Sequence, residues 1–259
     1  MRTKNLLLLF LSFVFILSCS PQEAALALAV SDFEVVVPAE GLTELDLKSG
    51  VCIYRGQPER PIRVLVSSPQ MQLTAVTIIY DQEKQLLTAN QQVELEAEED
   101  GVQVAGEQLE ITEEWAKLPA GGRIVSTTEE ASLVSSGTLC YLRAEEIVQA
   151  TGGFTLFYED WSLSGDQLEA NLADGFFTGR GALSFEHPEV AGEAERIEYD
   201  QKNELITLTG SPHLRWADGW LQGAEETVII YDLTSGKAKA VGPTKMRFSQ
   251  DTVVNPDGD

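Results

Sequence analysis

The stretch Ala75-Val-Thr-Ile-Ile-Tyr-Asp81 recurs in the same chain as Ala194-Glu-Arg-Ile-Glu-Tyr-Asp200. A third Tyr-Asp pair, Tyr231-Asp232, precedes the turn-forming sequence Leu233-Thr-Ser-Gly236. A single strand-turn-strand unit cannot bury its apolar face alone, so repeated units must stack on one another. We therefore predict an elongated all-β protein in which antiparallel strand units follow each other along one axis.

The rest of the chain supports this interpretation. Short apolar runs of roughly 4–8 residues alternate with turn residues at a spacing of roughly 8–12, which is typical of an all-β sandwich or barrel. Two stretches are ambiguous: Glu113–Leu118 also fits a helical turn, and Ala144–Gln149 fits a short helix or a strand. Pro119-Ala-Gly-Gly122 predicts a tight turn. We place a boundary there, between an N-terminal half at 32–120 and a C-terminal half at 121–250.

Two-residue alternation assigns the side chains to faces. In the second copy of the repeat Ile197 and Tyr199 share one face, while Arg196 and Glu198 share the other. One face is thus apolar and must be buried against a second sheet or against another apolar partner. These residues either fill a dry core or line an apolar groove. The candidate inner-face residues are Ile78, Tyr80, Leu95, Phe154, Leu156, Ile197, Tyr199, Leu214, Trp216, Ile229 and Tyr231.

The N-terminus has the features of a targeting segment. Arg2 and Lys4 precede an apolar run of about a dozen residues, where a membrane span needs roughly 20. We predict a signal peptide at 1–18, a lipidated Cys19 followed by a tether at 19–31, and a disordered tail at 251–259. The segment before Cys19 resembles a bacterial lipobox. The alternative is an uncleaved N-terminal anchor in which Cys19 has no role.

Composition excludes several classes of protein. The formal net charge of −23 opposes nucleic-acid binding, which depends on Lys and Arg neutralising phosphates. The sequence contains two histidines, His187 and His213, and no motif for zinc, a catalytic triad or a phosphate-binding loop. We therefore expect neither catalytic residues nor a metal site nor a cofactor. A hydrolase with two carboxylates stays possible, but nothing in the sequence selects one pair among 41 acidic residues.

Two cysteines remain besides Cys19. In an oxidising periplasm Cys52 and Cys140 form a possible disulfide. Two isolated thiols are the alternative, because the sequence does not place the two Cα atoms within bonding distance.

The order of motifs over residues 150–250 resembles the OstA/LptA-like family. It comprises the Ala-x(4)-Tyr-Asp strand at 194–200, a leucine-containing strand ending at Gly210, an aromatic strand, and Leu221-Gln-Gly223-Ala leading to Tyr231-Asp232. The likeness is weaker over 70–111 and poor elsewhere. It implies a β-jellyroll, or twisted β-taco, that is open at both ends and shields acyl chains of lipopolysaccharide (LPS) between two membranes. Lipidated Cys19 and the greater length depart from the family pattern.

The resemblance also implies a function and partners. We expect a non-enzymatic envelope protein on the periplasmic face of a membrane, which binds or bridges LPS or a related glycolipid during transport to the outer membrane. Expected partners are other β-jellyroll Lpt-type proteins of the LptA or LptC kind, an ABC transporter or an outer-membrane translocon, and further copies of the chain joined head to tail. The alternative is a structural envelope lipoprotein that uses its exposed strand edges for protein contacts and carries no lipid.

Overall fold

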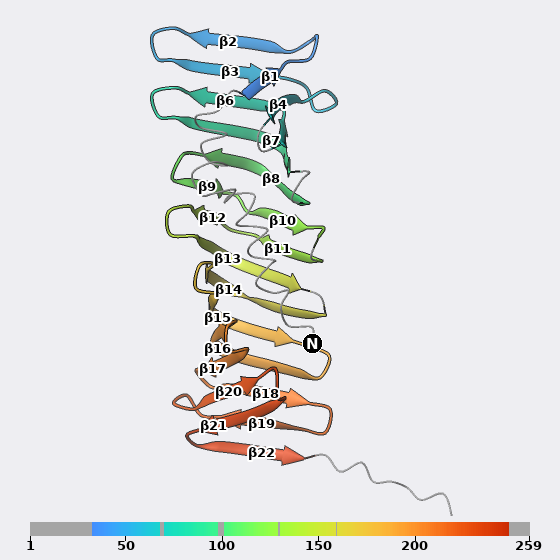
Figure 1. Cartoon of the computed structure of the whole chain (residues 1–259), viewed down its shortest axis with the longest axis vertical. Coiled ribbons are helices and arrows are strands. Elements are labelled where there is room, and N and C mark those ends of the chain that lie inside the picture. Colours follow the sequence, from blue (N-terminus) through green and yellow to red (C-terminus); the bar gives the residue numbers. More distant parts are fainter. Residues whose placement is uncertain (1–32, 68–69, 98–100, 129, 159, 249–259) are drawn as a thin grey trace, which may run out of the picture.

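The computed structural model describes residues 33–67, 70–97, 101–128, 130–158 and 160–248. These residues form strands and turns and contain no helix that could cross a membrane. The strands lie across the long axis and follow one another along it in approximate sequence order (Figure 1). Their bounds are β1 Phe33–Val36, β2 Leu42–Asp46, β3 Val51–Arg55, β4 Ile62–Ser67, β5 Gln70–Ala75, β6 Thr77–Asp81, β7 Leu86–Ala97, β8 Val102–Ile111, β9 Trp115–Leu118, β10 Gly122–Ser126, β11 Ala131–Ser135, β12 Leu139–Leu142, β13 Ile147–Tyr158, β14 Trp161–Asn171, β15 Phe176–Glu186, β16 Val190–Asp200, β17 Leu205–Thr209, β18 His213–Trp216, β19 Gly219–Gly223, β20 Val228–Asp232, β21 Lys237–Val241 and β22 Thr244–Phe248.

All pairings are antiparallel and form two ladders that we call arm A and arm B. Arm A has the order β2–β3–β6–β7–β8–β9–β12–β13–β14–β15–β16–β17–β20–β21. Arm B has the order β1–β4–β5–β7–β8–β10–β11–β13–β14–β15–β16–β18–β19–β22. The long strands β7, β8 and β13 to β16 belong to both arms, whereas each short strand belongs to one. The predicted all-β, antiparallel jellyroll fold is confirmed.

The long strands bend where they pass from one arm to the other. The pairing register shifts at 91–92 in β7 and at 152–153 in β13. The residues at these bends have positive φ angles: Gln91 (65°), Gln92 (52°), Gly152 (79°) and Gly153 (99°). Such a bulge bends a strand and interrupts its ladder. The bends therefore form the spine along which the two arms meet, and the apolar face lies between the arms.

The repeated Tyr-Asp pair closes the hairpin turns of arm A. The Oδ1 atom of Asp81 accepts a hydrogen bond from Lys84 N (3.1 Å), and that of Asp232 accepts one from Ser235 N (2.9 Å). Asp200 does the same with Asn203 N (3.1 Å). Asp side chains commonly fix turns in this way. The tyrosine before each Asp faces inward, so the motif combines an inner-face side chain with a turn.

The Asp side chains in these turns should make the stability of the folded protein depend on pH. Hydrogen bonds from Lys84, Asn203 and Ser235 lower the pKa of Asp81, Asp200 and Asp232 respectively. A lowered folded-state pKa stabilises the protein above the ordinary Asp value of about 3.9, and this contribution is lost as pH falls through the folded-state pKa.

We expect the triple variant Asp81→Asn, Asp200→Asn, Asp232→Asn to unfold at a lower temperature than the wild type at neutral pH. Asn keeps the turn-forming oxygen but does not titrate. The difference should shrink between about pH 5 and pH 2. Thermal unfolding followed by circular dichroism across this range measures it. A difference that stays constant with pH would show that these carboxylates do not couple folding to protonation.

A single apolar core runs along the molecule between the two arms. Buried residues from β4 to β20 belong to one contiguous cluster, from Ile62 to Tyr231. Strands on either side of the predicted boundary at 120/121 are direct neighbours, since β8 pairs with β10 and β9 with β12. The boundary therefore divides the sequence into halves that share one sheet and one core.

The structure corrects one expectation and decides between two pairs of alternatives. The predicted helical turn within 113–118 is wrong, because Trp115–Leu118 is strand β9 paired with β8 and β12. In the stretch 144–149 the strand alternative holds from Ile147 onward.

The possible disulfide is absent, because Cys52 and Cys140 are free thiols. They lie on β3 and β12 of arm A, five ladder steps apart, or about 24 Å at roughly 4.8 Å per step. A disulfide needs Cα atoms within about 7 Å.

Several expectations lie outside the described residues. These are the signal peptide at 1–18, the lipidation at Cys19, the tether at 19–31 and the tail at 251–259. They stay predictions.

Candidate functional site: an apolar groove between the arms

One register row crosses arm A from its first strands to its last and contains four of the chain's six tyrosines. We call it the tyrosine row. Its members are joined pairwise by the ladder, and the tyrosines recur at intervals along the long axis. The row comprises Cys52, Tyr80, Leu87, Ile111, Ala116, Tyr141, Val148, Ala170, Phe177, Tyr199, Ile206 and Tyr231.

A second inner-face row lies two residues nearer the spine, and we call it the floor row. Its side chains are aliphatic, and none is more than 3% exposed. It comprises Ile78, Ala89, Leu109, Leu118, Leu139, Ala150, Leu168, Ile197, Leu208 and Ile229, and Gly179 of β15, which has no side chain, stands between Leu168 and Ile197. Because one strand residue spans about 3.3 Å, the floor row lies about 7 Å deeper than the tyrosine row.

Polar residues follow the tyrosine row in the opposite direction, at the turns of arm A. We call this level the rim. The hydroxyl of Tyr80 donates a hydrogen bond to the side-chain oxygen of Gln85 (3.1 Å). Glu204 lies at the turn after Tyr199, and Arg143 lies two residues beyond Tyr141. From spine to rim, arm A therefore changes from aliphatic through tyrosine to charged side chains.

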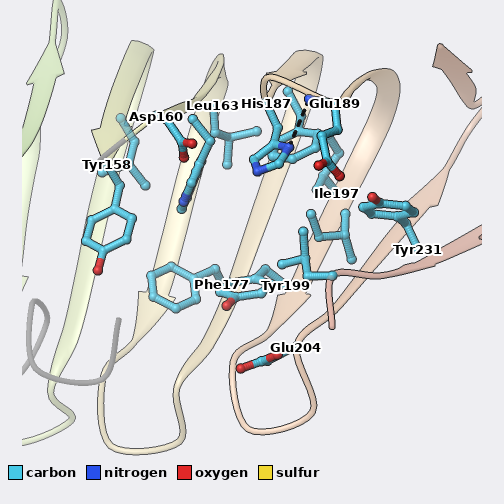
Figure 2. A pocket seen from close by; sticks show the side chains of 15 residues that line it. Tyr158, Asp160, Leu163, Phe177, His187, Glu189, Ile197, Tyr199, Glu204 and Tyr231 are labelled. Carbon is cyan, nitrogen blue, oxygen red and sulfur yellow. Dashed lines mark hydrogen bonds between the residues drawn. The ribbon is translucent and has the colours of Figure 1, made fainter. Parts of the chain in front are cut away.

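A cavity of about 230 Å³ opens between the arms in the C-terminal half. Arm A contributes Phe177, Ile197, Tyr199, Ile206 and Tyr231, and arm B faces them from the other side (Figure 2). The arm B residues are Leu156, Tyr158, Trp161, Leu163 and Phe185. Polar side chains lie at its edge, namely Asp160, His187, Glu189, and Glu204 on the arm A side. The cavity is thus apolar inside and polar, mainly acidic, at its entrance.

Aromatic side chains line both walls of this cavity. The rings of Phe177 and Tyr199 lie side by side on arm A, with centroids 5.7 Å apart (Figure 2). On arm B the ring of Trp161 lies between Tyr158 (5.8 Å) and Phe185 (6.1 Å). Tyr and Trp combine an apolar body with a polar tip and suit a boundary between apolar and wet surroundings.

The tyrosine hydroxyls stay protonated at neutral pH. Burial raises the pKa of Tyr199, and the charges of Glu204, Tyr158 and Asp200 act in the same direction. Burial also raises the pKa of Tyr231, with contributions from Glu189 and Asp232. These hydroxyls can therefore donate hydrogen bonds to a ligand, but they do not supply a base.

The structure places all eleven predicted inner-face residues in the core or against it. Seven belong to the buried cluster, and Tyr80, Leu95, Tyr199 and Trp216 pack against it while partly exposed. Leu156, Ile197, Tyr199 and Tyr231 line the cavity; the other seven lie elsewhere on the inner face.

Sequence reasoning missed the polar entrance and the second aromatic wall. Alternation along 176–186 places Phe177 and Phe185 on one face and is the signal that could have identified them. The entrance residues Asp160, His187 and Glu189 lie in turns, where alternation does not indicate the direction in which a side chain points.

Residues 170–237 match the family model described as LptA/(LptD N-terminal domain) LPS transport protein. This part of the chain is therefore similar to the LptA-type domain that the family model describes. The match spans most of the cavity-bearing part of the molecule, from the end of β14 to the start of β21. It confirms the resemblance to the OstA/LptA-like family where the repeated Tyr-Asp units at 194–200 and 231–232 lie.

Solved structures give weaker similarities. LptH, the LptA homologous periplasmic component of the lipopolysaccharide transport device from Pseudomonas aeruginosa, is 15% identical, with a TM-score of 0.26 over 58% of this chain and 83% of that chain. The G-box domain of the microcephaly protein CPAP is 12% identical, with a TM-score of 0.28 over 78% and 99%. No curated protein matches the sequence. At these scores the structural similarities carry no argument about function.

Proposed function

We propose that the chain binds the acyl chains of LPS or a related glycolipid between its arms, as a non-enzymatic part of glycolipid transport to the outer membrane. The supporting observation is the order of side chains across the groove, aliphatic at the floor row, tyrosine above it, and charged at the rim. An amphiphile that enters with its tails toward the spine meets a matching surface at each level. The similarity of residues 170–237 to an LptA-type domain supports LPS as the cargo.

The free energy of burying acyl chains is compatible with a carrier function. Each acyl CH₂ removed from water gains about 0.8 kcal/mol. The floor row is a run of buried apolar side chains, of which Ile197 lines the cavity, and it has no polar group that would fix one ligand geometry. Cargo could therefore move along the axis if the arms open over this row. The cavity has room without unfolding of the core, because it lies above the floor row.

The two ends of the jellyroll suit partners of the same architecture. The inner face continues to the terminal strands, where Leu45 of β2 and Phe248 of β22 are 54% and 65% exposed, although the ring of Phe248 contacts Trp216. We propose that another β-jellyroll protein of the Lpt type, or a second copy joined head to tail, pairs with these edges. An ABC transporter or an outer-membrane translocon carrying such a domain would dock in the same way.

The cellular location of the protein is also a proposal. The sequence pattern at 1–19 supports export and lipidation of Cys19, which would hold the jellyroll at the periplasmic face of a membrane. The tether at 19–31 would separate the domain from the bilayer.

Photo-crosslinking tests the groove. We expect a photoreactive amino acid in place of Tyr199 to crosslink glycolipid in cells. The same probe in place of the neighbouring Glu198 should give none, because Glu198 faces outward and forms an ion pair with Arg196. Lipid adducts are measured by the mobility shift of the purified protein and by LPS immunodetection.

The alternative function, a structural lipoprotein without cargo, gives a different outcome. Probes at Tyr199 and Tyr231 would then yield no lipid adduct, while probes in β2 and β22 would yield protein adducts. That result would overturn the proposal of a lipid carrier.

A further inference from the structure

Among the described residues, Arg143 is the one charged residue that is buried. Arg143 follows strand β12 by one residue and lies on the inner face, two residues beyond Tyr141 of the tyrosine row. Its residue exposure is 4%. Its backbone N–H donates to Glu114 O (3.0 Å), and its C=O accepts from Glu146 N (3.2 Å), so the β12–β13 turn fixes its position. At about 3.3 Å per residue it lies about 13 Å above the floor row.

The guanidinium of Arg143 lacks polar partners for two of its nitrogens. Nε and Nη1 are buried and form no hydrogen bond, and no described carboxylate lies within ion-pair distance of the side chain. Burial lowers the pKa of Arg143 to about 10, an effect that the charges of Tyr141 and Glu113 oppose. The side chain is therefore still cationic at neutral pH.

A buried charge without a partner is costly, and groups of this kind are normally paired. The planar fork of a guanidinium matches a phosphate in a bidentate manner, and the interaction is stronger away from bulk water. The rim is also the level at which the head group of an amphiphile lies when its acyl chains contact the floor row. An anionic head group at that level would meet Arg143 toward the N-terminal side of the cavity, whose lining does not include Arg143.

We propose that Arg143 is a phosphate-binding site that holds the head group of the lipid in the groove. This inference rests on the proposed lipid-binding function and adds a position and a chemical class to it. The site gives the groove a preferred placement of cargo, since the apolar rows alone would not distinguish one position along the axis from another.

The test compares two soluble lipids that differ in one phosphate. Dihexanoyl phosphatidic acid carries acyl chains and a phosphate monoester, and dihexanoylglycerol carries the same acyl chains alone. Binding to the full chain is followed by tryptophan fluorescence, because Trp161 lines the groove. We expect the wild type to prefer the phosphorylated lipid about tenfold. We expect Arg143→Gln to remove that preference while its affinity for dihexanoylglycerol stays unchanged.

Arg123→Gln is the matched control, because Arg123 lies on β10 with its side chain exposed and the charge change is the same. It should keep the wild-type preference. Equal affinity of the wild type for the two lipids would overturn the site, and this measurement does not depend on the folding of a variant. An Arg143→Gln protein that keeps the preference would also overturn it.

Two further outcomes distinguish a lipid phosphate from free phosphate, and failure of the Arg143 site from failure of the lipid-carrier function. Inorganic phosphate at millimolar concentration should compete weakly with the phosphorylated lipid. Complete competition at the concentration of the lipid would assign Arg143 to a free anion and overturn the head-group site. If neither lipid binds, the lipid-carrier function itself fails, whereas binding of both without preference removes the Arg143 site alone.

Discussion

Gly137→Val should destabilise the protein by about 3 kcal/mol, the upper end of the range for overpacking. Gly137 lies between β11 and β12, against the bend of β13. A Cβ atom there would overlap the carbonyl oxygen of Thr151 and lie 2.9 Å from the Cα atom of Gly152. These atoms belong to the backbone, so no rotation of a side chain relieves the overlap.

Hydrogen bonds prevent the bend from moving away. Ser136 N donates to Gly153 O (3.1 Å), Ser136 Oγ donates to Gly152 O (2.8 Å), and Thr151 N donates to Thr138 O (2.9 Å). A valine at 137 must break some of these or shift the spine where both arms meet. For a protein of this size the loss corresponds to a fall of roughly 6–12 °C in Tm.

Thermal and urea unfolding of the variant measure this effect. Ala238→Val, which adds a comparable volume at an exposed position of β21, is the control and should change stability by no more than about 0.5 kcal/mol. If Gly137→Val unfolds like the control, the close packing of 135–138 on the β13 bend does not contribute to stability.

The sequence predicts the fold well wherever side chains alternate against a covered face. Ile197 and Tyr199 illustrate this, because each inner-face residue has a buried neighbour on both sides in the ladder. The edge strands β2 and β22 were not predicted. Every residue in them is exposed, so burial imposes no apolar alternation on their sequences.

The spine also escaped prediction. The segments 86–89 and 93–97 read as two strands because Gln91-Gln92 interrupts the alternation between them. They form one strand, β7, that bends at these residues and serves both arms. A break in alternation therefore has two structural causes, a turn or a bend, and local sequence does not distinguish them.

The exposed apolar residues at the end of the jellyroll should have a large effect on self-association. We expect the double variant Met246→Glu, Phe248→Glu to weaken end-to-end association at least about 100-fold. Met246 pairs with the buried Leu221 and Phe248 with Gly219, so both residues continue the inner face of arm B beyond its last covered strand. Burial of such a side chain at an interface contributes roughly 1.5–3 kcal/mol. Two losses of that size exceed the 2.8 kcal/mol that corresponds to about 100-fold.

Lys245→Glu together with Arg247→Glu is the matched control, because these residues alternate with the first pair on the same strand and point to the other face. Sedimentation velocity over a concentration series should show assembly for the wild type and the control but monomers for the double variant. Equal loss in both variants would indicate that the strand edge itself, through its backbone or its charge, drives association. Assembly that survives in the inner-face variant would place the contact elsewhere, and the groove would then end at β22 instead of continuing into a neighbouring jellyroll. That distinction matters for transport, because a lipid can pass between subunits without contacting water only if the apolar inner face is continuous across the junction.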